Sequence, residues 1–217
     1  MVNENHRPTP KMPLAVVLFT MAYLLPAIAA AVRTGNGEFV FYSVVMVILA
    51  AVVIVVHRNC DLSQPVLWGL SVWGLAHMVG GLVPIPESWP SNGPVRVVYS
   101  WWLIPNCLKY DQVVHAFGFG VTTFVCWHGL AALVRSIDPS HRLPATFGVL
   151  VLCVAAATGF GALNEVIEFT ATLLIPNTNV GGYVNTGWDL VSNLVGAVSA
   201  ACWIRWANGF PTVNNGK

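Results

Sequence analysis

Residues 39–56 read FVFYSVVMVILAAVVIVV, a run without a single charged side chain. A helix needs about 20 mostly apolar residues to cross the hydrocarbon core of a bilayer. In the whole chain of 217 residues, 56% are hydrophobic and 9% are charged, whereas a soluble domain carries roughly 25% charged residues. The composition therefore excludes an ordinary water-soluble fold and predicts that the lipid bilayer is the main partner of the chain.

Five further apolar runs of similar length flank this stretch, separated by short links that contain Pro, Gly and charged residues. We predict an all-α polytopic membrane protein with six transmembrane helices, over residues 14–32, 39–56, 66–83, 110–134, 145–175 and 187–206. The transmembrane domain then covers residues 14–206, between an N-terminal tail of residues 1–13 and a C-terminal tail of residues 207–217. With a formal net charge of +1 and no basic cluster, the chain offers no binding surface for nucleic acid.

The cations indicate the orientation, because cytoplasmic links are enriched in Lys and Arg. Most of the cations lie in the two tails and in the links that follow the second and the fourth span. Only three lie in the links on the other side: Arg33, Arg96 and Lys109. We therefore predict that both termini are cytoplasmic. The 84–108 link would then face outward with the 176–186 link.

Ionisable side chains inside the predicted spans are the most informative residues. An ionised group in the hydrocarbon region costs on the order of 2.5–3.5 kcal/mol, so it needs a partner or a function. At about 1.5 Å per residue, all of these groups fall in the outer half of their spans. They are four carboxylates and two histidines, namely Asp111, Glu165, Glu168, Asp189, His77 and His115.

The spacing of these residues predicts that they meet in one polar pocket. Residues three or four positions apart lie on the same face of a helix, as do Asp111 with His115, Glu165 with Glu168, and Asp189 with the polar Asn193. Glycine accompanies each face, and small residues let helices approach closely in lipid. The faces carry Gly74, Gly81, Gly118, Gly161 and Gly196.

Four carboxylates cannot all stay ionised side by side in a medium of low dielectric without compensation. Three resolutions are open: a bound cation, protonation of one or more acids, and salt bridges from Arg96 and Lys109. The set of His77, Asp111, His115, Glu165, Glu168 and Asp189, with Asn193 as polar support, would suit a divalent metal such as Zn²⁺, Mn²⁺ or iron. No motif for a nucleotide, flavin or haem is present.

Four blocks of sequence resemble the YjdF-like family of bacterial inner-membrane proteins. They read HMVGG at 77–81, KYDQVVHAFGFG at 109–120, GALNEVIEF at 161–169 and GWDLVSNLVGA at 187–197. The last three blocks also resemble the VanZ-like proteins. The resemblance implies a multi-pass helical protein of the bacterial inner (cytoplasmic) membrane, without an established biochemical activity.

Three classes of function remain open on the sequence alone. The chain could be an accessory or scaffolding subunit of a larger membrane assembly, in which the polar core only determines helix pairing. It could be a metal-dependent hydrolase or transferase acting on lipid or envelope precursors, with Glu165 or Glu168 as the catalytic general base. It could also be a proton or cation pathway, although polar residues toward the cytoplasmic side are sparse.

Overall fold

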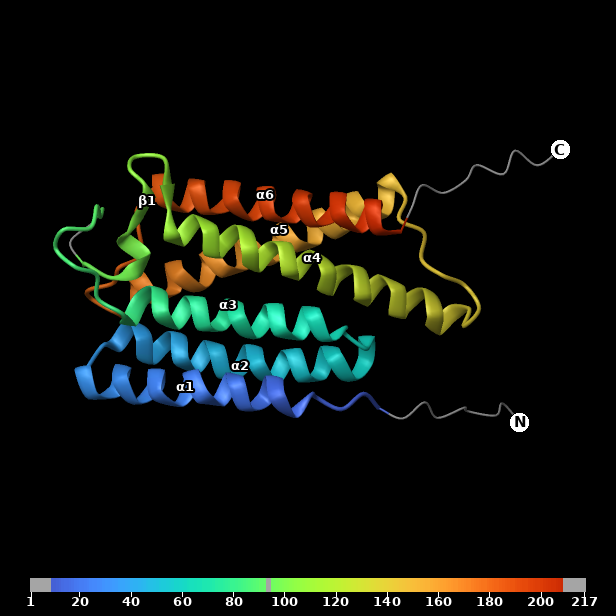
Figure 1. Cartoon of the computed structure of the whole chain (residues 1–217), viewed down its shortest axis with the longest axis horizontal. Coiled ribbons are helices and arrows are strands. Elements are labelled where there is room, and N and C mark those ends of the chain that lie inside the picture. Colours follow the sequence, from blue (N-terminus) through green and yellow to red (C-terminus); the bar gives the residue numbers. More distant parts are fainter. Residues whose placement is uncertain (1–8, 93–94, 209–217) are drawn as a thin grey trace.

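Six long helices run side by side along the molecule (Figure 1). The structure, a computed structural model, describes residues 9–92 and 95–208. The helices are α1 (Leu14–Thr34), α2 (Gly37–Cys60), α3 (Gln64–Leu82), α4 (Tyr110–Ile137), α5 (Phe147–Leu174) and α6 (Tyr183–Ala207). All six are long and apolar enough to cross a membrane, which confirms the predicted all-α, six-span fold. The predicted tails lie largely outside the described residues.

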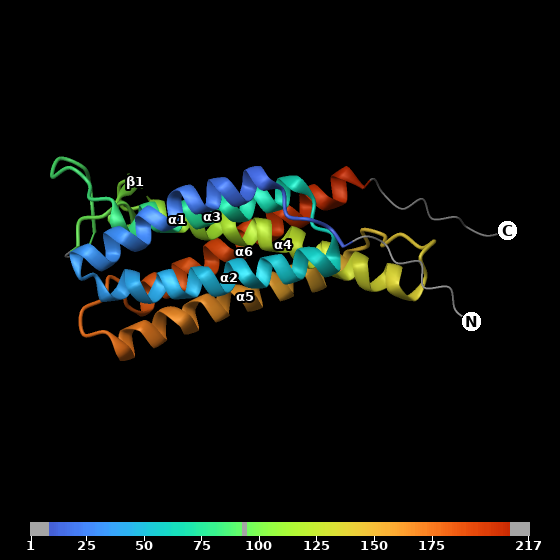
Figure 2. The same ribbon diagram turned by 90° about the horizontal axis from the view of Figure 1, so that it is seen from below.

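The helices form two groups of three, α1–α3 and α4–α6, which pack together through α3 and α4 (Figures 1 and 2). Helix α1 begins and helix α6 ends at the same end of the bundle. The opposite end, where α3 ends and α4 begins, is called the cluster end below. The predicted cytoplasmic location of the termini stays a prediction.

Large apolar side chains cover the outside of the bundle, as expected of a surface in contact with lipid. On α2 the side chains of Val44 and Ile48 are exposed, and on α5 those of Phe160 and Leu163 are exposed. Because such a surface in water would cost about 25 cal/mol for each Å² of apolar area, the bilayer is the solvent that this fold requires.

Helices α4 and α6 make the closest approach in the bundle. A Cβ atom added to Gly196 on α6 would overlap the backbone carbonyl of Ala116 on α4, and one added to Gly161 on α5 would meet the side chain of Asn193. The prediction that small residues on the polar faces permit close helix packing is therefore confirmed at these positions. Close packing restrains the polar side chains that these helices carry.

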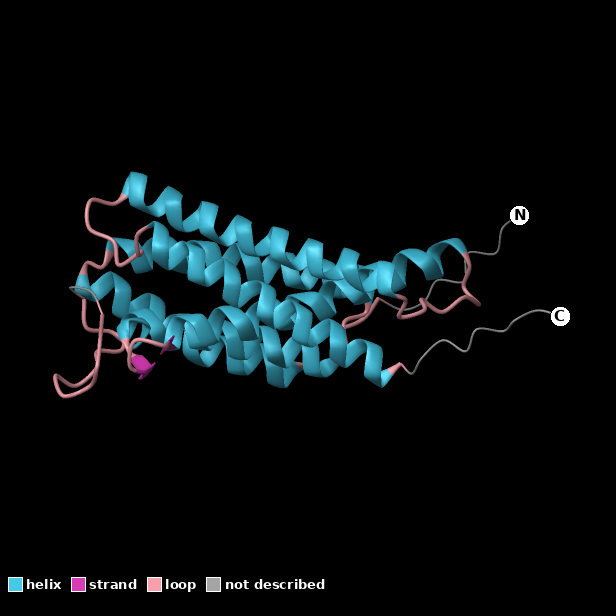
Figure 3. Cartoon of the chain, turned by 90° about the horizontal axis from the view of Figure 1, so that it is seen from above, coloured by secondary structure: helices cyan, strands magenta, loops and turns pink. Residues whose placement is uncertain are grey.

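The segment between α3 and α4 is folded rather than extended. It contains the short helix η1 (Val98–Ser100) and an antiparallel hairpin of β1 (Trp102–Ile104) and β2 (Leu108–Lys109), visible at the cluster end (Figure 3). The guanidinium of Arg96 donates to the Ser91 hydroxyl and to the carbonyls of Pro86, Glu87 and Trp89. This cation therefore organises its own loop.

Helix α6 begins at Tyr183, four residues before the predicted start at residue 187. The backbone N–H groups of Asn185 and Thr186 donate to the carbonyl of Gly182, which starts the helix. The earlier start places Asn185 on the same face as Asp189, one turn before it. As a result a polar side chain that was assigned to the link becomes part of the site.

Candidate functional site

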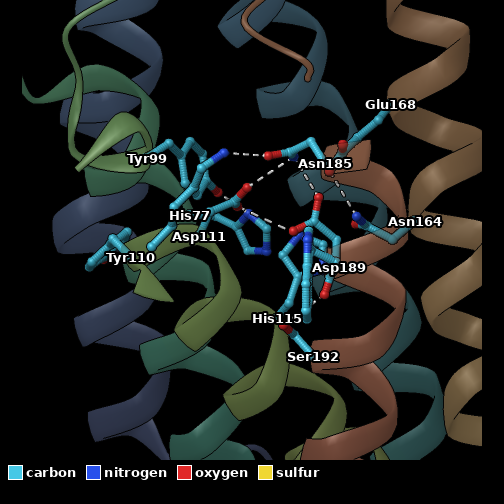
Figure 4. Close-up of polar contacts among 12 residues, drawn as sticks. His77, Tyr99, Tyr110, Asp111, His115, Asn164, Glu168, Asn185, Asp189 and Ser192 are labelled. Carbon is cyan, nitrogen blue, oxygen red and sulfur yellow. Dashed lines mark hydrogen bonds and ion pairs between the residues drawn. The ribbon is translucent and has the colours of Figure 1, made fainter. Parts of the chain in front are cut away.

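Side chains from α4, α5 and α6 meet in the interior near the cluster end (Figure 4). Asp111 and His115 come from α4, Glu165 and Glu168 from α5, and Asp189 from α6. The structure therefore brings together five of the six ionisable residues that the sequence singled out. We call these five residues the acid–histidine cluster.

His115 lies at the centre of the acid–histidine cluster, with 1% of its side chain exposed. Its Nδ1 atom is 3.0 Å from Oδ1 of Asn193, and its Nε2 atom is 3.6 Å from Oδ1 of Asp111. An amide oxygen can only accept, so Nδ1 carries the proton and donates to Asn193. The lone pair of the neutral imidazole is then on Nε2, on the side of Asp111.

Two subsets of the cluster have the geometry of a metal site, and they share His115. In each subset, one potential ligand atom per residue lies within 4.8 Å of the others: Asp111, His115 and Asp189 form the first, and His115, Glu165 and Glu168 form the second. A neutral imidazole has one free lone pair, so His115 can serve only one of them at a time. Because Nδ1 is committed to Asn193, the geometry favours the subset with Asp111 and Asp189.

Several buried polar atoms in the cluster and on the adjacent Asn193 have no hydrogen-bond partner among the described residues. Both carboxylate oxygens of Glu165, Oδ1 of Asp189 and Nδ2 of Asn193 are in this state. Glu165 has 9% of its side chain exposed, and its Oε1 atom is 3.9 Å from Nδ1 of His115. An unpaired buried charge costs several kcal/mol, so these acids need either a bound cation or protonation.

Two amide side chains hold the carboxylates in place. Nδ2 of Asn185 donates to Oδ2 of Asp189 at 2.6 Å and approaches Oδ2 of Asp111 at 3.5 Å. Nζ of Lys109 donates to Oδ1 of Asn185 at 2.6 Å, so the lysine reaches the acids through this amide. Asn164 donates to Oε1 of Glu168 at 2.9 Å.

His77 lies beside the cluster and belongs to neither of the two subsets with metal-site geometry, so its role as a metal ligand stays a prediction. Its ring centroid is 6.3 Å from that of His115. The hydroxyl of Tyr99, on η1, forms a hydrogen bond with Nδ1 of His77. Burial raises the pKa of Tyr99 well above its ordinary value, so the phenol stays neutral. His77 therefore anchors the loop between α3 and α4, beside the cluster.

The possibility that Arg96 neutralises the carboxylates through a salt bridge is not supported, because its guanidinium forms hydrogen bonds within its own loop. Lys109 is the nearer cation, and its ammonium also lies 5.4 Å from the centroid of the Trp102 ring. A single amide-bridged ammonium cannot neutralise four carboxylates. Most of the negative charge therefore remains to be compensated in another way.

A cleft leads from the cluster toward the lipid-facing surface between α2 and α5. Its walls at the cluster end are polar, and its walls farther along α2 are apolar; this α2–α5 cleft is lined by Glu38, Tyr42, Val45, Met46, Leu49, His77, Tyr99, Asp111, Asn164, Ile167, Glu168 and Asn185, among others. A second cavity, on the other side of Glu168, is lined by Glu165, Phe169, Tyr183 and Thr186, among others. Glu168 thus borders both openings.

The sequence interpretation missed Glu38, Tyr99, Asn164 and Asn185. Glu38 was placed in a link, yet it is buried at the start of α2 and accepts a hydrogen bond from the backbone N–H of Asn179 at 2.8 Å. For two of these residues a signal was present, since Asn164 and Asn185 each lie four positions before an acid, Glu168 and Asp189. Tyr99 and Glu38 reach the site through contacts that no sequence spacing indicates: Tyr99 bonds to His77, and Glu38 bonds to the backbone of Asn179.

A model of one protein family matches residues 14–209, and its description is "Predicted membrane protein (DUF2238)". The match spans all six helices and the whole cluster. No curated protein and no solved structure matches the chain. The resemblance to a family of multi-pass membrane proteins is confirmed, and the further resemblance to VanZ-like proteins stays a prediction.

Proposed function

The chain belongs to the DUF2238 family of predicted membrane proteins, and from the geometry of its buried cluster we propose that it is a metal-dependent membrane enzyme. Asp111, His115 and Asp189 would bind one divalent ion, Zn²⁺, Mn²⁺ or iron. The reaction would be hydrolysis or group transfer on a lipid or envelope precursor. The observation that carries the proposal is that potential ligand atoms of Asp111, His115 and Asp189 lie within 4.8 Å of one another in the interior, where Oδ1 of Asp189 has no hydrogen-bond partner among the described residues.

The three side chains suit a catalytic metal because they leave coordination positions open. Ligand atoms about 2.0–2.2 Å from a metal ion are at most about 4.4 Å apart. Here the three atoms lie within 4.8 Å of one another, so rotations of the carboxylates suffice to close the site. A site with three protein ligands can accept water or substrate in the remaining positions.

The residues around the ligands support the same proposal. Metal-binding histidines usually donate their second N–H to an oxygen, which selects the tautomer and orients the ring. Asn193 would provide this oxygen for His115, and Asn185 would hold the carboxylate of Asp189. These two amides therefore act as positioning residues.

Glu165 is the best candidate for the general base. Its carboxylate has no hydrogen-bond partner among the described residues, and it lies outside the favoured ligand set but next to it. A bound metal lowers the pKa of its water, and a nearby carboxylate can accept the proton. Glu168, which accepts from Asn164 and borders both cavities, would position the substrate.

Metal analysis of the purified protein tests the proposal. After loading with Zn²⁺, Mn²⁺ or Fe²⁺ and removal of excess ions, we expect about one ion per chain, measured by inductively coupled plasma mass spectrometry. Substitution His115→Ala should abolish this stoichiometry, because it removes the only nitrogen ligand. The matched control is His128→Ala, which removes a half-buried histidine of the same helix outside the cluster.

Two results would refute the metal site. One is wild-type protein that retains none of the three ions after loading. The other is His115→Ala protein that retains as much metal as His128→Ala protein.

An accessory or scaffolding role remains the second candidate, and the loop between α3 and α4 favours it. This loop is folded, and it exposes Trp89, Leu103 and Ile104 at the cluster end. Exposed apolar side chains on an ordered loop are a common feature of protein–protein contacts. Co-purification of a membrane partner by the wild type, but not by Ile104→Asp protein, would support this role.

A proton or cation pathway has the least support. It would need polar groups that continue along the bundle away from the cluster. The hydroxyls of Thr122, Thr123 and Thr158 each donate to a carbonyl of their own helix. Among the described residues, these hydroxyls are therefore already engaged. The location in the bacterial inner membrane remains an expectation from the family resemblance.

A further inference from the structure

The α2–α5 cleft changes character along its length. On α2 its wall is formed by Glu38, Tyr42, Val45 and Leu49. These residues recur every three or four positions, so they lie on one face of the helix. From Glu38 to Leu49 the wall runs for about 16 Å along the helix axis, from an acid at the cluster end to aliphatic side chains deeper in the span.

The apolar part of the cleft adjoins the lipid-facing surface. Leu49 is itself exposed, and the neighbouring Ile48 on α2 and Leu163 on α5 are exposed as well. Since α2 and α5 lie side by side without packing tightly against each other (Figure 2), an acyl chain could enter from the bilayer sideways. The aliphatic wall provides the environment that such a chain prefers.

The polar part of the cleft reaches the proposed metal site. Asp111 and Glu168 line the cleft and also belong to the acid–histidine cluster. Asp111 has 18% of its side chain exposed, whereas His115 has 1%. A molecule in the cleft would therefore meet the ligand set at Asp111.

The charges at this polar end select the kind of head group. Three carboxylates, of Glu38, Asp111 and Glu168, line the cleft, and no Lys or Arg is among the residues that line it. The carboxylate of Glu38 accepts a hydrogen bond from the backbone N–H of Asn179, and that of Glu168 accepts one from the amide of Asn164. Such a surface attracts a cation and repels an anionic head group.

We infer that the α2–α5 cleft binds a phospholipid with an ammonium-bearing head group, whose acyl chain lies along Val45, Met46 and Leu49 and whose ammonium lies between Glu38 and Glu168. This inference rests on the proposed function in one respect: it takes the bound phospholipid to be the class of substrate on which the proposed enzyme acts. The binding step itself needs no metal.

The test is lipid retention by the full-length protein. Protein reconstituted in nanodiscs with equal parts of phosphatidylethanolamine and phosphatidylglycerol of identical acyl chains is released and examined by native mass spectrometry. For the wild type we expect about tenfold more retained phosphatidylethanolamine than phosphatidylglycerol. Leu49→Trp and, independently, Val45→Trp should fill the cleft and reduce retention about tenfold. The matched control, Ile48→Trp, places the same ring on the lipid-facing surface and should retain lipid like the wild type.

A second substitution tests the head group. Glu38→Gln should remove the preference for phosphatidylethanolamine while total retention changes little. Equal retention of the two lipids by the wild type would overturn the ammonium assignment. Retention by both tryptophan variants equal to that of the Ile48→Trp protein would overturn the cleft as the binding site.

Metal content, measured on the same preparations, separates this inference from the proposed function. The cleft variants change no ligand of the metal, so their metal content should equal that of the wild type. Selective lipid retention by protein that binds no metal would refute the proposed function and leave the lipid site standing. Normal metal content without selective lipid retention would refute the lipid site and leave the proposed metal site standing.

Discussion

Helices α4 and α6 approach each other backbone to backbone, whereas α2 and α5 leave a cleft between them. Gly196 on α6 lies against the carbonyl of Ala116, while α2 presents larger side chains, Tyr42 and Met46, to the cleft. The tight interface buries His115 and Asp189 almost completely. The open face leaves Asp111 and Glu168 accessible. One side of the site is thus closely packed and the other borders a cleft, and three experiments test this difference.

The largest effect is expected from Gly196→Ala. The added Cβ would overlap the backbone carbonyl of Ala116, which cannot rotate away, so α4 and α6 must separate. We expect the free energy of unfolding in detergent to fall by about 3 kcal/mol, the upper end of typical overpacking costs. Denaturant titration followed by tryptophan fluorescence measures it.

The control for this substitution lies on the same helix. A Cβ added at Gly187 would meet no atom within 4 Å, and alanine favours a helix by up to about 1 kcal/mol relative to glycine. Gly187→Ala should therefore leave the protein as stable as the wild type or slightly more stable. Equal losses in the two variants would contradict the close contact of α4 and α6.

Removal of metal should have the next largest effect. An ion that binds only the folded protein stabilises it by about 2.7 kcal/mol at a free concentration of 100 Kd. Chelation should therefore lower the melting temperature of the wild type. Asp189→Asn keeps the shape of the side chain but removes the ligand charge, so its melting temperature should be the same with metal and with chelator. A wild type that is insensitive to chelation would place the acids in a purely structural role.

The smallest of the three effects is expected from Asn193→Ala. Without the amide oxygen, His115 loses the partner that selects its tautomer. Changes to such positioning residues cost about 10–100-fold in metal affinity, which competition with a fluorescent chelator can measure. Ser192→Ala is the matched control, because the Ser192 hydroxyl donates to the carbonyl of Trp188 in its own helix. If both variants bind metal like the wild type, Asn193 has no role in orienting the histidine.

The sequence was sufficient to predict the six helices, because apolar runs of the length of a bilayer have few alternatives. The start of α6 was less predictable. Residues 183–186 contain the polar Asn185 and Thr186 and follow two glycines, a pattern that favours a link. In the structure these residues are helical, and Lys109, directly before α4, donates to Asn185.

Most of the cluster could be predicted for a similar reason. Spacings of three and four place Asp111 with His115, and Glu165 with Glu168, on single helix faces whatever the helices pack against. Spacing cannot show which faces meet. His77 illustrates this limit, since its depth in α3 resembles that of the proposed metal ligands in their helices but its Nδ1 faces Tyr99.

The amino-acid sequence was enough to predict six spans and the polar residues of the last four, because both depend on local periodicity and on the cost of a charge in lipid. The packed structure was needed to show which nitrogen of His115 is free, which acids lack partners, and that Glu38 and Tyr99 line the cleft. These properties depend on contacts between residues that are distant along the chain, and such contacts follow from how the helices and loops pack.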